Sequence, residues 1–155
     1  MLPLAGDKTL RLSRTFRAPA SAVFDAWTSE DVLRRWFRAQ HDWETPSASV
    51  DLRVGGEVRV VMRDPSRDVS IGGGGVYTEV EPPNRLAFTW LWDSDSRRTL
   101  IEIDFVESDG ETTVRFTHTG LWDEEAVRAH EGGWTRCFEN LARVFEELRE
   151  VGTDA

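Results

Sequence analysis

The sequence has little sulfur and a deficit of positive charge. Cys137 is the only cysteine, so the chain can form neither an internal disulfide nor a multi-cysteine zinc site. Against 28 aspartate and glutamate residues it carries 19 lysine and arginine residues, and its formal net charge is −9. Because this charge repels phosphate groups, we expect no nucleic-acid partner and no attraction to anionic lipid headgroups.

Long hydrophobic runs are also missing. No apolar stretch approaches the ~20 residues that cross a membrane, and residues 1–7 lack the charged start and apolar centre of a signal peptide. A lone thiol suits a reducing compartment. We therefore predict a cytoplasmic protein without membrane insertion.

Tryptophan, in contrast, is abundant, with seven residues in a chain of 155 beside a single tyrosine. This length fits one compact domain, which we place at residues 8–150, with flexible termini at 1–7 and 151–155. Seven large, rigid rings in one small core need either tight mutual packing or a space to surround. Which of the two applies is the functional question.

Periodic apolar residues predict an α+β fold. Alternation with polar residues indicates strands, and recurrence at helical spacing indicates helices. About seven strands result, and because all but the first follow one another directly, we expect an antiparallel sheet. The predicted elements are strands at 8–17, 50–54, 58–62, 76–80, 86–92, 101–105 and 114–118, and helices at 19–28, 30–37 and 123–150.

Two glycine-rich stretches interrupt this pattern. Gly72 to Gly75 lie in a strand region, where four residues without side chains predict a bulge or a flexible bend at a sheet edge. Gly132 and Gly133 weaken the first third of the last helix and favour a division there. Undivided, this helix would reach about 42 Å and cross the whole sheet.

Several short motifs resemble, in their order, those of bacterial proteins similar to the C-terminal domain of the activator of the ninety-kilodalton heat-shock protein's ATPase. The opening motif is the segment 18–28, followed by Trp36-Phe37. The later motifs are 51–56 with its glycine pair, the strand 75–80, the segment 82–86 with Thr89-Trp90, and Gly133-Trp134. Together they span residues 8–150.

This resemblance implies the helix-grip fold of the SRPBCC superfamily, which includes START domains and the birch-pollen allergen. In that fold a curved antiparallel sheet wraps a long C-terminal helix, and a short helix pair follows the first strand. A cavity often lies between sheet and helix. Lipid carriers, hormone receptors, polyketide cyclases and co-chaperone domains share the fold, so it identifies no activity by itself.

A cavity between the sheet and the last helix would be lined mainly by apolar residues. The competing interpretation is a filled core, because aromatic stripes at strand or helix spacing usually pack against one another. Trp90, Trp92 and Trp134 are predicted to face one another there. The candidate ligand-binding residues are Trp36, Trp43, Val60, Met62, Thr78, Trp90, Trp92, Ile103, Phe116, His118, Trp134, Cys137, Phe138 and Leu141.

His118 is the main polar candidate, since its alternation with Phe116 places it on the inner face near a strand end. A neutral imidazole there can bond a ligand or act as a general base, which makes His118 the one catalytic candidate. The competing interpretation is a core histidine bonded to neighbouring groups. His130 can approach the same end, and His41 is expected in solvent. Because the three histidines lack metal-site spacing, we predict neither a metal nor a cofactor.

These observations leave three functional hypotheses. The first is binding of a small hydrophobic or aromatic molecule in the cavity. The second is a cyclase- or hydrolase-like enzyme in the same cavity, but most acidic residues alternate outward and no catalytic pair stands out, so we lean against an enzyme. The third, implied by the resemblance alone, is a co-chaperone-like adaptor that stimulates a heat-shock-protein ATPase in the stress response. Exposed edge strands are also compatible with a homodimer.

Overall fold

The computed structural model describes residues 3–153, with side chains through Glu150. Its seven strands form one antiparallel sheet in the order β1-β7-β6-β5-β4-β3-β2. The elements are β1 (Lys8–Phe16), α1 (Ala20–Thr28), α2 (Glu30–Trp36), β2 (Glu44–Val50), β3 (Glu57–Asp64), β4 (Val69–Glu81), β5 (Arg85–Trp92), β6 (Thr99–Ser108), β7 (Glu111–Leu121) and α3 (Glu124–Thr153). This confirms the predicted α+β class with a helix pair after the first strand.

The helix pair begins where local sequence signals place it. Pro19, with φ of −70°, precedes α1. Ser29 ends α1 and caps α2, because its Oγ accepts a hydrogen bond from the backbone N–H of Val32 at 3.4 Å. The acids Glu30 and Asp31 follow in the first turn, where they complement the helix dipole.

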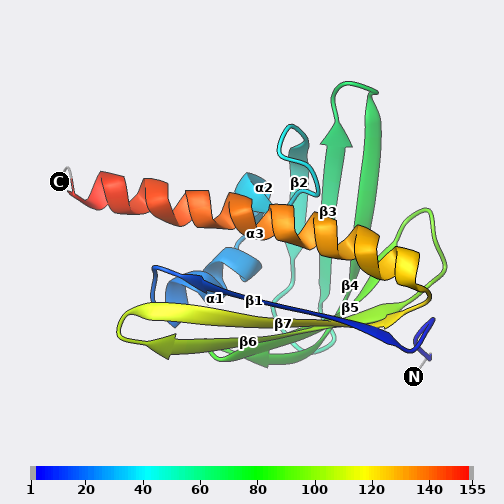
Figure 1. Ribbon diagram of the computed structural model, residues 1–155, viewed down its shortest axis with the longest axis horizontal. Helices are drawn as coiled ribbons and strands as arrows, with labels where there is room; N and C mark the ends of the chain where they lie inside the picture. Colours follow the sequence, from blue (N-terminus) through cyan, green and yellow to red (C-terminus); the bar gives the residue numbers. More distant parts are fainter. Residues whose placement is uncertain (1–2, 154–155) are drawn as a thin grey trace.

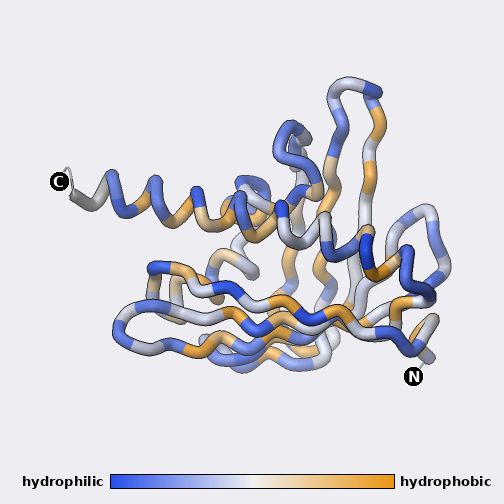
Figure 2. Tube along the Cα trace, viewed as in Figure 1, coloured by the Kyte–Doolittle hydropathy of each residue, from blue (hydrophilic) through white to orange (hydrophobic). Residues whose placement is uncertain are grey.

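The sheet bends sharply at β5, which pairs with β6 on one side and β4 on the other. In Figure 1 the axes of β1, β7 and β6 are aligned with one another, and those of β2, β3 and β4 are aligned along a different axis. Helix α3 lies across both groups of strands. Hydrophobic and hydrophilic residues alternate along these strands in Figure 2, as expected for a sheet with one buried face. The bend leaves the first half of α3 opposite the ends of β3 and β5.

Helix α3 is continuous, so the division expected at Gly132-Gly133 is wrong. One face of the helix is buried, including Trp134, Phe138, Leu141 and Phe145. Burial of this face stabilises the helical conformation by more than the roughly 1 kcal/mol that each glycine costs relative to alanine.

The first hairpin starts earlier than predicted. Strand β2 ends at Val50, and Leu52 and Val54 lie in the connecting loop with 40% and 64% of their surface exposed. Gly55, with φ of +87°, turns the chain into β3. The alternation at 50–54 therefore indicated a strand where the chain already turns.

Strand β4 differs from the prediction in two respects. Gly72 to Gly75 lie inside it, and β4 is an interior strand between β3 and β5 rather than an edge. The register with β5 shifts between Tyr77 and Glu79, which leaves Thr78 as the extra residue of a bulge. Tyr77, which precedes the bulge, is buried, while Thr78, predicted to face inward, is exposed. Beyond the bulge the alternation is reversed, so Val80 packs against the core.

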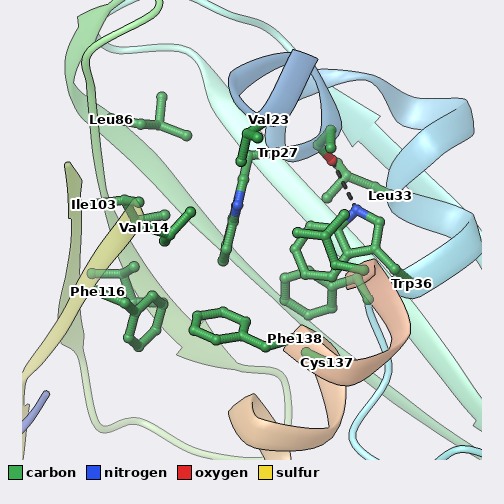
Figure 3. Close-up of a cluster of buried hydrophobic side chains, with 14 of the residues drawn as sticks. Val23, Trp27, Leu33, Trp36, Leu86, Ile103, Val114, Phe116, Cys137 and Phe138 are labelled. Carbon is green, nitrogen blue, oxygen red and sulfur yellow. Dashed lines mark hydrogen bonds between the residues drawn. The ribbon is translucent and has the colours of Figure 1, made fainter. Parts of the chain in front are cut away.

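The core is continuous between the sheet and all three helices. Figure 3 shows Trp27 of α1 and Phe138 of α3 pointing toward one another, with ring centroids 6.0 Å apart. Trp36 packs against Trp27 at 4.7 Å and donates its indole N–H to the carbonyl of Ala26 at 2.9 Å. Helices α1 and α2 are thereby fixed against α3.

Part of the N-terminal segment lies against the sheet end. Ala5 donates its backbone N–H to the carbonyl of Arg98 at 2.9 Å, and a Cβ on Gly6 would collide with the carbonyl of Leu121. Of the termini that we expected to be flexible, residues 1–2 and 154–155 lie outside the described residues.

Candidate functional site

A cavity of about 210 Å³ opens between the first half of α3, the segment after α2, and the sheet strands β3 and β5. Three aromatic rings, a methionine and small residues form most of its wall. The lining residues are Phe37, Ala39, Met62, Trp92, Ala129, His130, Gly133, Trp134 and Cys137. A cavity of this composition attracts apolar molecules more than water.

Four of the fourteen candidate residues line this cavity, namely Met62, Trp92, Trp134 and Cys137. Trp36, a candidate ligand-binding residue, is instead fully buried against Trp27 of α1. Trp43 is partly buried against the core, and Thr78 is exposed on the opposite face. The others are buried in the core around the cavity, namely Val60, Trp90, Ile103, Phe116, His118, Phe138 and Leu141.

Five lining residues were not among the candidates. Phe37 ends α2, where its helical spacing indicated ordinary core. Ala39, Ala129 and Gly133 line the cavity because they are small, and periodicity carries no signal for empty space. The sequence predicted only that His130 approaches the strand end where His118 lies.

Phe37 joins the tryptophans that we expected to meet. Its ring stacks on Trp90 with centroids 5.6 Å apart and meets the edge of Trp134 at 5.3 Å. Trp90 in turn packs edge-on against Trp92 at 5.3 Å. The aromatic wall is therefore one contiguous surface contributed by α2, β5 and α3.

His118 lies behind this wall, fully buried, and does not line the cavity. Its Nδ1 accepts the indole N–H of Trp134 at 3.1 Å, so the proton is on Nε2, which donates to Oγ1 of Thr99 at 2.7 Å. Burial lowers the pKa of His118 to about 3, and the neighbouring His130 adds to this shift. The ring is thus neutral, with both nitrogens engaged, as in the competing interpretation of a core histidine.

His130 forms a second pair with a tryptophan, and this one lies in the cavity wall. Its Nδ1 is 2.7 Å from the carbonyl of Ala126, which can only accept, so Nδ1 carries the proton. Its Nε2 accepts the indole N–H of Trp92 at 3.2 Å. Burial also lowers the pKa of His130, which keeps this imidazole neutral at pH 7.

The segment that follows α2 is held to α3 by side chains of the helix. Arg136 Nε donates to the carbonyl of Ala39, and the Cys137 thiol donates to the carbonyl of Arg38 at 3.2 Å. Asn140 donates to the carbonyl of Trp36 at 3.3 Å and lies 2.8 Å from Nδ1 of His41. We call residues 36–41 the wall segment.

The Cys137 thiol is part of this wall and is not prepared for nucleophilic chemistry. Burial raises its pKa to about 12, so the thiol stays protonated at pH 7. It behaves as a small apolar residue.

Beside His130, outside the cavity lining, the connection between β5 and β6 packs on Trp122, which precedes α3. The guanidinium of Arg97 lies 3.8 Å above the ring of Trp122, which meets His130 edge-on at 5.8 Å. Asp95 binds Arg97 through both carboxylate oxygens, which lowers the pKa of Asp95 to about 2. Trp122 thus separates this charged pair from His130 of the cavity wall.

Neither a metal site nor a membrane-spanning helix is found in the described part of the chain. Residues 3–153 hold no group of three or more histidine, cysteine, aspartate or glutamate side chains arranged for a metal ion. None of the helices within that range is long and apolar enough to span a membrane.

A curved antiparallel sheet that packs on a long C-terminal helix, with an apolar cavity between them, defines a helix-grip protein. The sequence profile of the family described as activator of Hsp90 ATPase homolog 1-like protein matches residues 17–146, and the chain belongs to this family. Among curated protein sequences no significant match is found.

Solved structures with the same fold include several bacterial proteins. One from Chromobacterium violaceum has a TM-score of 0.81 at 22% identity, over 90% of this chain and 98% of the other. The AHSA1 protein of Silicibacter pomeroyi has a TM-score of 0.77 at 26% identity, over 96% of this chain and 100% of the other. An AHSA1-like protein of Aeromonas hydrophila has a TM-score of 0.72 at 28% identity, over 90% of this chain and 94% of the other.

Proposed function

We propose that this protein binds a small, uncharged aromatic or apolar molecule in the cavity beside α3. The observation that carries the proposal is the composition of the wall. Phe37, Trp92 and Trp134 offer ring faces and edges, and Met62 offers a flexible thioether. Such a surface gains from burying apolar area.

The hydrogen-bonding state of the wall supports an uncharged ligand. The polar side-chain atoms of Trp92, His130, Trp134 and Cys137 are each paired within the protein. A charged group that entered the cavity would lose water without meeting an opposite charge, which costs several kcal/mol. A neutral ring meets no such cost.

The volume limits the size of the ligand. An engineered apolar cavity of about 150 Å³ is known to bind benzene, while pockets for drug-sized ligands begin at roughly 300 Å³. The cavity of about 210 Å³ lies between these values. It suits one aromatic ring with a substituent, or two small fused rings.

The adjacent helix glycines provide a matched test. An ideal Cβ on Gly133 would lie 3.5 Å from the Cβ of Ala39, an ordinary contact, so a leucine there extends into the cavity without a backbone clash. A Cβ on Gly132 would meet only the flexible end of Arg136, and Gly132 does not line the cavity. Leucine at either position also improves helix propensity.

We expect toluene to bind the wild-type protein saturably, as measured by calorimetry and by the change in tryptophan fluorescence. Gly133→Leu should weaken toluene binding by at least about tenfold, because the leucine side chain occupies the space of the ring. Gly132→Leu should bind as the wild type does. Equal affinities in both variants, or no binding to the wild type, would refute the proposal.

A further inference from the structure

The pair formed by Trp92 and His130 gives the cavity wall one donor and one acceptor that point at each other. The indole can only donate, and its N–H lies 3.2 Å from Nε2 of the imidazole. Both side chains line the cavity, and both are partly exposed. A ligand can therefore reach this pair without opening the core.

The hydrogen bond between Trp92 and His130 always runs from the indole N–H to the imidazole nitrogen. Nδ1 of His130 donates to the carbonyl of Ala126 at 2.7 Å, so Nε2 holds a lone pair and no proton. Burial lowers the pKa of His130, which keeps Nε2 unprotonated at pH 7. The wall thus presents a fixed N–H donor beside a fixed nitrogen acceptor.

We propose that the ligand carries a hydroxyl group on its ring, as a phenol does, and that this hydroxyl inserts between Trp92 and His130. The hydroxyl oxygen accepts from Nε1 of Trp92, and the hydroxyl proton is donated to Nε2 of His130. One hydrogen bond within the protein is replaced by two to the ligand. This inference rests on the proposed binding function and specifies its ligand class.

Insertion requires the two nitrogens to separate from 3.2 Å to about 4.5 Å, the span of two hydrogen bonds that meet at one oxygen. The two tryptophan–histidine pairs, Trp134 with His118 and Trp92 with His130, differ in how freely their side chains can separate. Trp134 and His118 are buried, and His118 is also bonded to Thr99. Trp92 and His130 lie at the rim, where a small shift breaks fewer packing contacts.

Other polar groups match this pair less well. A carboxylate or phenolate has no proton for Nε2 and would bring a negative charge against its lone pair. A ketone or ether accepts from Trp92 but leaves Nε2 of His130 without a donor, and an unpaired buried acceptor costs free energy. An ammonium group has no acceptor for the indole. A neutral hydroxyl supplies both functions at one atom.

The test compares phenol with toluene, which have the same ring and similar size. Their different affinities for water cancel when the ratio of the two Kd values, toluene over phenol, is compared between variants. Calorimetry measures this ratio for the wild type, for Trp92→Phe, which keeps an aromatic ring but loses the N–H, and for Trp122→Phe. Trp122 touches the His130 ring but does not line the cavity, so it is the matched control.

We expect the ratio to fall about tenfold in Trp92→Phe and to stay unchanged in Trp122→Phe. His130→Leu, which removes the acceptor, should lower the ratio in the same direction and serves as an independent variant if Trp92→Phe fails to fold. An unchanged ratio in a folded Trp92→Phe or His130→Leu variant overturns the hydroxyl inference while toluene binding still supports the proposed function. Failure of both ligands to bind the wild type overturns both.

Discussion

At the scale of single residues, His118 illustrates how a polar side chain is held in an apolar core. It receives a hydrogen bond from Trp134 and gives one to Thr99, whose hydroxyl is 3.3 Å from the carbonyl of Trp90. Each donor in this series of hydrogen bonds has one acceptor, so the imidazole is buried without an unpaired nitrogen. The network joins α3, β5, β6 and β7.

The lowered pKa of His118 makes stability depend on pH. Its folded-state pKa is about 3, below the value of about 6.5 in the unfolded chain, so the unfolded state binds a proton more readily. The stabilisation is complete above pH 6.5 and is lost as the pH falls toward 3. We expect the free energy of unfolding to fall by up to about 1.4 kcal/mol per pH unit from this residue.

Urea unfolding at pH 7, 6, 5.5 and 5 measures this slope in a range where most carboxylates stay ionised. His118→Gln should be less stable at pH 7, because the hydrogen-bond chain is broken, but should depend less on pH. His130, whose pKa is also lowered, contributes the same slope to both proteins. Parallel curves for wild type and variant would show that His118 does not carry the effect.

The place of His118 on the inner face was predictable from alternation with Phe116, but its partners were not. Trp134 is distant in sequence and reaches it only because α3 lies across β7. The same applies to Phe37, which bridges Trp90 and Trp134 from the end of α2. Periodicity identifies which face a residue occupies, whereas contacts between elements depend on the bend of the sheet.

At the scale of elements, β4 shows why a strand can contain four consecutive glycines. A Cβ on Gly73 would lie 2.7 Å from the ring of Trp90 and 2.9 Å from that of Trp92. Both indoles, which meet edge to face, therefore lie directly against the glycine backbone. On the opposite face, Gly72 lies beside the ion pair of Arg59 and Asp93.

Alanine substitutions separate these two roles. Gly73→Ala should lower the free energy of unfolding by about 2–3 kcal/mol, because packed rings of the core must move. Gly72→Ala, the matched control, should cost less than about 1 kcal/mol, since the Cβ meets the ends of two flexible surface side chains. Thermal unfolding measures both, and equal losses would contradict the assigned role of Gly73.

The direction of β4 side chains was the part of the sheet that alternation could not provide. Val76, Thr78 and Val80 alternate as if they shared one face, but the bulge at Thr78 places Val80 with Tyr77 instead. Alternation across β5, β6 and β7 contains no bulge, and there the predicted inner residues are buried except Trp92, which is partly exposed in the cavity wall. A single extra residue reverses every side chain beyond it.

At the scale of the whole molecule, the core extends without interruption from the β1-β7-β6 half of the sheet to the β2-β3-β4 half. Tryptophans on α1, α2, β5 and α3 all belong to it or pack against it. We therefore expect one cooperative unfolding transition, with coincident midpoints by tryptophan fluorescence and by far-ultraviolet circular dichroism. A separate early change in fluorescence would instead indicate that the β2-β3-β4 half opens by itself.

The attachment of the wall segment has a consequence for the speed of ligand exchange. Residues 36–41 are tied to α3 by single side-chain bonds from Arg136, Cys137 and Asn140. Such bonds break one at a time, whereas the strands on the other side of the cavity are joined by continuous ladders. We therefore expect residues 38–41 of the wall segment, which follow the buried Trp36 and Phe37, to move more readily than the strands and to set the rate at which the ligand enters and leaves. Loosening these ties would shorten the residence time and speed association by the same factor, with the equilibrium affinity unchanged.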